Sequence, residues 1–289
     1  MWDRYTRGVT WDDVIDYGWW IGPWAMVTLV LVWRVGWLSP RAMISGPRRI
    51  VGLGPFDLVA ALGLMLLGFS VATLVTDQVA PPAKMMFASP THRAALILWS
   101  QVATFLGPTV YVLWRARMHA DGWRRLGVIP RQPLRDIGAA LIGLVVALPL
   151  VFGAILSAVC VEILLGLPVP KDGHEMITLL KQSKSGVVQA LVGTMAIGLA
   201  PVFEELLYRG LLQTALVSVL PRRRWVVVLV ASAMFALVHA VVPWHALPGL
   251  FVLGVVLGWL YERTGSLWPP IGVHAGFNAV SVAMTIWVT

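Results

Sequence analysis

Charged residues are scarce in this chain of 289 residues. Asp, Glu, Lys and Arg together make up 12% of it, about half the fraction that is usual in a soluble domain. Hydrophobic residues make up 58%, and the mean hydropathy is +0.79. This balance excludes an ordinary soluble domain and predicts a polytopic membrane protein. No internal repeat or low-complexity tract interrupts the pattern, so we expect a single integrated membrane domain.

Cysteine is almost absent, and acidic residues are fewer than basic ones. The single Cys160 cannot form an internal disulfide, and in its apolar stretch it is expected to be a small buried hydrophobe. The net charge is +8, which could indicate a nucleic-acid partner. However, the basic residues lie in short loops between apolar runs, where the positive-inside rule places them. We therefore expect the lipid bilayer as the environment and no nucleic acid as a partner.

The apolar runs set the expected fold class. About 17–25 apolar residues are needed to cross a bilayer. By that measure the sequence predicts an all-α, polytopic integral membrane helix bundle of about eight transmembrane helices. Residues 1–185 would hold helices 1–4 with their loops, and residues 186–289 would hold helices 5–8. The candidate spans are Tyr17–Trp33, Asp57–Thr76, Ala94–Trp114, Asp136–Leu165, Gly186–Val219, Trp225–Val242, Ala246–Glu262 and Leu267–Val288.

The distribution of arginine predicts the orientation of the bundle. Arginines gather in the loops after the first, third and fifth candidate spans, and Arg263 ends the seventh. Alternate loops lie on one side of a membrane, so these loops are expected in the cytoplasm and both termini outside. The expected location is the cell membrane.

Three short motifs place polar side chains within the apolar last third of the chain. A charged residue at the centre of a membrane helix costs about 2.5–3.5 kcal/mol on insertion scales, so such residues are expected to meet one another in a functional site. Residues spaced four apart share one face of a helix. The motifs are E-E-x-x-x-R with Glu204, Glu205 and Arg209, then F-x-x-x-H with Phe235 and His239, then H-x-x-x-N with His274 and Asn278.

The residue types in these motifs fit peptide hydrolysis. That reaction needs an activated water, a group that takes its proton, and donors for the oxyanion. The three motifs, in this order and with a glycine-rich apolar segment before the last, resemble the CPBP intramembrane protease family, named after CAAX proteases and bacteriocin processing. Its best-known members are the type II CAAX prenyl endopeptidases. The resemblance covers about Leu199–Ser281 and implies that residues 186–289, with helices 5–8, are the catalytic core.

The resemblance implies a role for each motif residue. Glu204 would be the general base, with His239 helping to position the water. His274 and Asn278 would form the oxyanion site. Glu205 and Arg209 would form a supporting ion pair, and Phe235 is expected to contribute packing. These roles imply an intramembrane endopeptidase that cleaves a membrane-anchored peptide or protein, or a lipidated, CAAX-like one, from a cavity open to the cytoplasm.

A metal mechanism stays open at this point. Two histidines and a glutamate are a common set of ligands for catalytic zinc, so Glu204, His239 and His274 could hold a divalent metal. Against this, H-E-x-x-H is absent, and each histidine comes from a different predicted helix. Either no cofactor is required or a divalent metal such as zinc is bound, and we favour the glutamate mechanism without a metal.

Other interpretations of the same residues stay open as well. Glu205 and Arg209 have the spacing of a structural ion pair within one helix. An intramembrane histidine or asparagine can simply hydrogen-bond two helices together. The whole motif set could also be retained in a membrane scaffold or a bacteriocin-immunity-type protein that is not an enzyme. A transporter is disfavoured, because the first four spans carry little charge and no inverted repeat is visible.

One geometric difficulty accompanies the shared site. Counted from the arginine-rich ends at about 1.5 Å per residue, Glu204 and His239 lie roughly 21–22 Å deep, whereas His274 lies only about 10 Å deep. Straight helices would therefore not bring the three side chains together. We expect an irregularity, either helices that extend into the cytoplasm or a break in the fifth span near Pro201, where proline removes a backbone donor.

Overall fold

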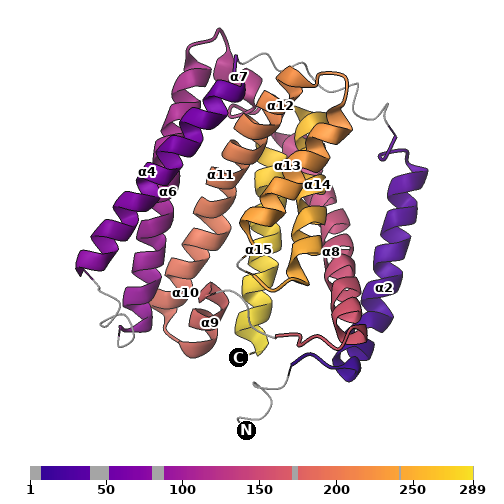
Figure 1. Ribbon diagram of the computed structural model, residues 1–289. Helices are drawn as coiled ribbons and strands as arrows, with labels where there is room; N and C mark the ends of the chain where they lie inside the picture. The colour runs from indigo at the N-terminus through magenta and orange to yellow at the C-terminus, as the bar shows by residue number, and fades with distance from the viewer. Residues whose placement is uncertain (1–7, 40–51, 80–87, 171–174, 241, 289) are drawn as a thin grey trace.

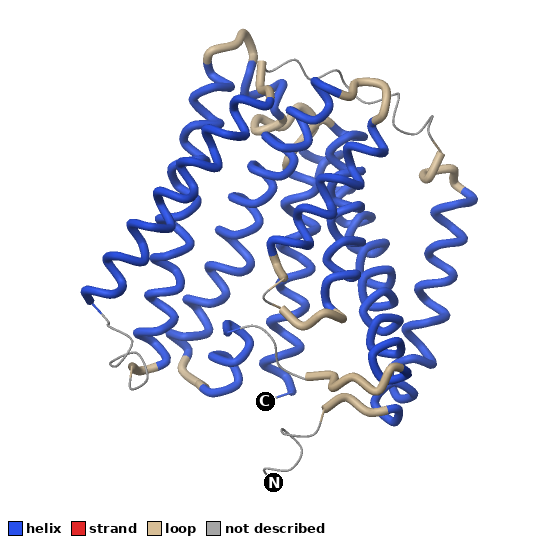
Figure 2. The backbone as a smooth tube through the Cα atoms, viewed as in Figure 1, coloured by secondary structure: helices blue, strands red, loops and turns tan. Residues whose placement is uncertain are grey.

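The structure is a computed structural model that describes residues 8–39, 52–79, 88–170, 175–240 and 242–288. Within these ranges all regular structure is helical and no strand occurs (Figure 2). Six helices of the described part of the chain are long and apolar enough to cross a membrane. These observations confirm the predicted all-α membrane bundle. Of the other two predicted spans, one forms a helix of only 15 residues and the other forms the helix that carries His274 and Asn278.

The N-terminal half forms four long helices and one short one. Two of them, α4 and α6, pack as a pair at one side of the bundle, and α2 packs against α8 at the other side (Figure 1). Their bounds are α2 (Trp11–Arg34), α4 (Pro55–Val79), α6 (Pro90–Arg117), α7 (Gly122–Leu126) and α8 (Pro133–Leu164). The buried carboxylate of Asp57 joins the α4–α6 pair, because it accepts hydrogen bonds from Tyr111 Oη at 2.8 Å and Arg115 Nε at 2.6 Å.

The C-terminal half surrounds a central helix. Figure 1 shows α15 between the fifth membrane helix, which runs from Gly186 to Val219, and α8. Helix α15 packs against both. The bounds are α9 (Glu175–Gln182), α10 (Gly186–Gly193), η1 (Thr194–Leu199), α11 (Ala200–Glu205), η2 (Leu206–Gln213), α12 (Thr214–Val219), α13 (Arg224–Val238), α14 (Ala246–Thr264) and α15 (Trp268–Val288).

The fifth membrane helix does not break at Pro201, so that form of the prediction is wrong. The helix continues from Gly186 to Val219, and two π-helical segments, η1 and η2, flank the short α11 that contains the two glutamates. A π-helical turn pairs residues five apart and often marks a functional site. Pro201 lies inside this continuous helix, so its missing N–H leaves one carbonyl of the preceding turn without a backbone donor. The expected irregularity is therefore present, as a change in helical winding.

The end of the sixth helix accounts for the rest of the difference in depth that was expected between His239 and His274. The prediction extended it to Val242, but α13 ends at Val238 and His239 is its C-cap. The connection between α13 and α14 lies part-way along the bundle and not at its end (Figure 2). His239 therefore stands at a helix terminus part-way along the bundle, where its partly buried ring can contact side chains of neighbouring helices.

The arginine-bearing helix ends lie together. The C-terminal ends of α2, α6 and α14, the short α7 and the turn between α12 and α13 all lie at the same end of the bundle (Figure 1). This arrangement agrees with the alternation of basic loops in the sequence. We call this the arginine-rich end.

Close contact between α13 and α14 depends on a glycine. A Cβ atom at Gly254 would lie 2.9 Å from Ser232 Cβ and 3.0 Å from Ser232 Cα, which is too close for an unshifted backbone. Because the carbonyl of Gly254 also accepts a hydrogen bond from Arg209 Nη2 at 3.1 Å, moving α14 away would disturb the polar interior. Gly254 thus sets both the helix spacing and a polar contact.

Replacing Gly254 with alanine is therefore expected to destabilise the protein by about 1–3 kcal/mol, the range for overpacking a well-filled interior. Thermal unfolding of the purified protein in detergent measures the effect. The matched control is Gly138→Ala on α8, where an added Cβ meets no atom within 4 Å. Equal melting temperatures for the two variants would contradict this account of the α13–α14 contact.

Candidate functional site

The three motifs converge around one carboxylate oxygen. Glu204 lies on α11, His239 caps α13 and His274 lies on α15. Glu204 Oε2 is 3.8 Å from His239 Nε2 and 3.9 Å from His274 Nε2. Three segments far apart in the sequence thus bring three ionisable groups to one place. The predicted meeting of these side chains is what the structure shows, whereas their chemical roles remain proposals.

The partners of each imidazole define which nitrogen carries the proton. His239 Nδ1 lies 2.7 Å from the carbonyl oxygen of Phe235, which can only accept, so Nδ1 donates. His274 Nδ1 lies 2.9 Å from Glu205 Oε1, an oxygen that also accepts from Arg209. In each neutral ring the proton is therefore on Nδ1, and Nε2 keeps a lone pair. Both lone pairs belong to the nitrogens nearest Glu204.

Glu204 Oε2 is a buried oxygen without a hydrogen-bond partner among the described residues, as is Glu205 Oε2. Glu204 is only 7% exposed, and Oε2 is buried without a hydrogen bond to any part of the chain that the structure describes. A buried carboxylate without a donor costs several kcal/mol. Because His239 Nε2 is an acceptor as well, the arrangement calls for a small donor between these atoms. A water molecule can donate one hydrogen to Glu204 Oε2 and the other to His239 Nε2, and it can accept from His274 Nε2 when that ring is protonated.

The spacing of the trio is wider than a tetrahedral zinc site requires. With bonds of about 2.0–2.1 Å, an ion bonded to two atoms 3.8–3.9 Å apart would make an angle of roughly 140° at the metal, well above the tetrahedral angle of about 109°. Among the described residues, no group of three or more His, Cys, Asp and Glu side chains is placed to hold a metal ion. A water oxygen at about 2.8 Å from each atom fits the same spacing.

A buried ion pair lies next to the site and contacts His274. Glu205 and Arg209 are 0% and 1% exposed, and Arg209 Nη1 donates to Glu205 Oε1 at 3.0 Å. Because the same oxygen accepts from His274, the pair fixes the orientation of that ring, as carboxylates do for catalytic histidines. The predicted ion pair is therefore present, and it contacts the site directly.

A second cluster of polar residues, which the sequence did not predict, connects the same helices. Gln213 Nε2 donates to Gly258 O at 3.0 Å and to Glu262 Oε1 at 2.8 Å, and Arg224 Nη1 donates to Glu262 Oε2 at 2.6 Å. Gln213 follows Arg209 by four residues, so its position on the same helix face was visible in the sequence. These residues join the fifth helix to α13 and α14.

Phe235 lies at the centre of the site as packing. Its ring, only 1% exposed, lies 4.9 Å from the His239 ring and 5.7 Å from the His274 ring, centroid to centroid. The guanidinium carbon of Arg209 lies 4.9 Å from the same centroid, within cation–π range. Tyr208, which carried no signal in the sequence, packs edge-on against Phe235 at 5.2 Å. Phe235 therefore sets the spacing of both histidines.

Asn278 has a structural partner in the fifth helix. Its Nδ2 donates to the carbonyl oxygen of Ala196 at 2.7 Å. In a π-helical turn that carbonyl would pair with the residue five positions on, which is Pro201 and has no N–H. Asn278 thus satisfies a carbonyl that the proline leaves unpaired. One hydrogen of its amide group is committed to this bond, and the second remains available for another acceptor.

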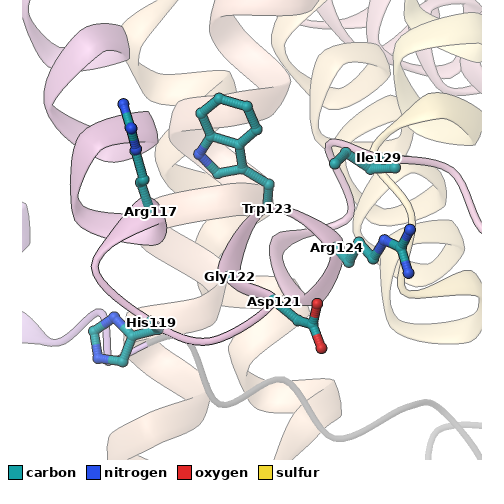
Figure 3. Close-up of a pocket in the computed structure, with 7 residues that line it drawn as sticks. All are labelled: Arg117, His119, Asp121, Gly122, Trp123, Arg124 and Ile129. Atoms are coloured by element: carbon teal, nitrogen blue, oxygen red, sulfur yellow. The ribbon is translucent and has the colours of Figure 1, made fainter.

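A basic hollow at the arginine-rich end does not contribute to this site. It has a volume of about 500 Å³ and is lined by Arg117, His119, Asp121, Gly122, Trp123, Arg124 and Ile129. Figure 3 shows the side chains of Arg117 and Arg124 pointing away from each other. Because its positive charges diverge and none of the motif residues lines it, the hollow is separate from the convergent histidines and glutamates.

The comparison with protein families gives one match. Residues 186–280 match the family described as Type II CAAX prenyl endopeptidase Rce1-like, and this range contains all three motifs. The match confirms the family resemblance predicted from those motifs. The comparisons with curated proteins and with solved structures found no match.

Proposed function

We propose that the protein is an intramembrane endopeptidase that hydrolyses a peptide bond of a membrane-anchored or lipidated, CAAX-like substrate with a water activated by Glu204 and His239. One observation carries the proposal: the Nε2 atoms of two histidines converge on a buried carboxylate oxygen that has no hydrogen-bond partner among the described residues. The family match of residues 186–280 supports the same class of activity. The integral membrane bundle supports a membrane-bound substrate.

The reaction follows from the protonation states. Water held between Glu204 Oε2 and His239 Nε2 gives a proton to the carboxylate as its oxygen attacks the scissile carbonyl carbon. The carbon–nitrogen bond then breaks, and the proton passes from Glu204 to the leaving amine. His239 is kept as an acceptor by its bond to the Phe235 carbonyl. It therefore orients the water rather than protonating it.

The oxyanion needs donors, which we assign to His274 and Asn278. His274 donates from Nε2 when its ring is protonated, and Glu205 beside Nδ1 stabilises that positive charge. Asn278 offers the amide hydrogen that Ala196 does not use. Such donors typically contribute about 2.7–4 kcal/mol each to the transition state.

The proposed setting is the cell membrane, with the arginine-rich end and the opening of the site in the cytoplasm. The test is cleavage of a library of membrane-anchored peptides, with and without a prenyl group, by the purified full-length protein in lipid vesicles. We expect hydrolysis at one bond, insensitivity to a metal chelator, and no hydrolysis by Glu204→Ala.

Three outcomes would count against this proposal. Cleavage by Glu204→Ala at the wild-type rate would contradict the role of the carboxylate. Loss of activity in chelator that zinc restores would replace the water mechanism with a metal one. No cleavage of any peptide, together with an unchanged cellular phenotype for Glu204→Ala, would indicate a scaffold or an immunity-type protein that keeps the motif for folding.

A further inference from the structure

A second cavity lies between α2 and the helices α8, α13 and α14. Its volume is about 470 Å³, within the usual range of small-molecule sites, and its walls come from α2, α8, α13 and α14. None of the seven motif residues lines it. In Figure 1, α2 stands apart from α13 and α14 and reaches the bundle through α8. The cavity is therefore distinct from the site described above.

The walls of this cavity are apolar along most of its length. On α8 the lining residues extend from Arg135 to Leu150, and on α14 from Thr264 back to Phe251. At about 1.5 Å per residue, the first of these ranges measures roughly 22 Å along the helix axis. One leaflet of a bilayer has a hydrocarbon depth of about 15 Å. The length thus suits one acyl chain with its headgroup at the end.

The polar end of the cavity is basic. Arg135 and Arg263 line it at the arginine-rich end of the bundle, together with Thr264. No acidic side chain is among the lining residues, all of which lie in the described part of the chain. Guanidinium groups bind phosphate through paired charge-assisted hydrogen bonds. The charge of this end therefore complements an anionic headgroup.

Three tryptophans line the cavity near its basic end. Trp37 stacks on Trp259 with ring centroids 4.7 Å apart, and Trp259 Nε1 donates to the Trp37 carbonyl at 3.2 Å. Trp225 Nε1 donates to the carbonyl of Ser39 at 3.3 Å. These bonds fix the segment after α2 across α13 and α14. Tryptophan favours the level of the lipid headgroups, which places the basic end at that depth.

We infer that this cavity is a binding site for one anionic phospholipid, with an acyl chain between α2, α8 and α14 and the phosphate on Arg135 and Arg263. An apolar slot of this length buries the methylene groups of one chain along its course, which favours binding. The headgroup arginines add selectivity for negative charge. The bound lipid would fill the space between α2 and the rest of the bundle.

The test counts lipids retained by the purified full-length protein. Protein stripped of lipid is mixed with phosphatidylglycerol or phosphatidylcholine of the same chain length, and native mass spectrometry reports the bound fraction. We expect one retained phosphatidylglycerol and much less phosphatidylcholine. Arg135→Gln/Arg263→Gln is expected to lower retention of phosphatidylglycerol at least about tenfold, because charged hydrogen bonds are lost. Val146→Phe, which fills the slot without changing charge, is expected to lower it as well.

The matched control is Arg131→Gln/Arg222→Gln, which removes two exposed positive charges from the same end of the bundle but none from the cavity. Equal retention of the two lipids, or an equal loss in the control, would overturn the proposal. So would displacement of phosphatidylglycerol by a prenylated cysteine, since the slot would then belong to the substrate. The melting temperature of Val146→Phe shows whether that variant is folded, and the arginine variants test the proposal independently of it.

Discussion

Glu204→Gln is expected to lower kcat by about 10²–10⁴-fold, the usual contribution of a general base, with little change in KM. Glutamine has the same shape but cannot take a proton from water. Because Glu204 Oε2 has no hydrogen-bond partner among the described residues, the substitution breaks no protein hydrogen bond, and the melting temperature should be preserved or raised. Cleavage kinetics and thermal unfolding of the same preparation measure both effects.

The control for this experiment is Asp136→Asn on α8. Asp136 is as buried as Glu204, at 7% exposure, and its Oδ2 accepts a hydrogen bond from Ser266 at 2.7 Å. Asparagine keeps the accepting oxygen, and the position lies outside the motif residues. We therefore expect activity close to that of the wild type. A loss in the control equal to that of Glu204→Gln would show that removing any buried carboxylate impairs the protein.

Arg209→Leu is expected to destabilise the protein by about 3–5 kcal/mol, the cost of leaving one member of a buried ion pair without its partner. Glu205 would remain 0% exposed, with only His274 Nδ1 to neutralise it. The Gly254 carbonyl on α14 would lose its donor as well. The free energy of unfolding in mixed micelles measures this change.

The double variant Glu205→Gln/Arg209→Leu tests the reason for that loss. Glutamine removes the buried charge and can still accept the hydrogen bond from His274, so the double variant should be more stable than Arg209→Leu alone. The exposed Arg223→Leu serves as the control, with an expected change of at most about 0.5 kcal/mol. If the double variant were the less stable one, the unpaired charge would not be the cause of the destabilisation.

The sequence predicts the helices and the members of the site because both depend on local patterns. Apolar runs of membrane length gave the bundle, and polar residues four apart within those runs marked Glu204, His239 and His274. The physical reason is the high cost of unpartnered polar groups in lipid, which makes their meeting predictable.

The details of the backbone could not be predicted in the same way. Nothing in the sequence distinguishes a helix broken at Pro201 from one that passes it with a change to π-helical winding, because the choice depends on partners from other helices. Asn278, which hydrogen-bonds Ala196 O, is such a partner. The end of α13 at Val238 does have a signal in the sequence, because Pro243 lacks the N–H that would pair with the His239 carbonyl and disfavours helix in the residue before it.

The most direct test of the shared site is a crystal structure of the protein in a lipid environment, at a resolution that shows water, with anomalous data at the zinc absorption edge. We predict one solvent molecule within about 3.2 Å of Glu204 Oε2, His239 Nε2 and His274 Nε2, and no anomalous signal there. Glu204 turned toward another protein donor, with the two imidazoles facing separate surroundings, would contradict the proposed activation of water.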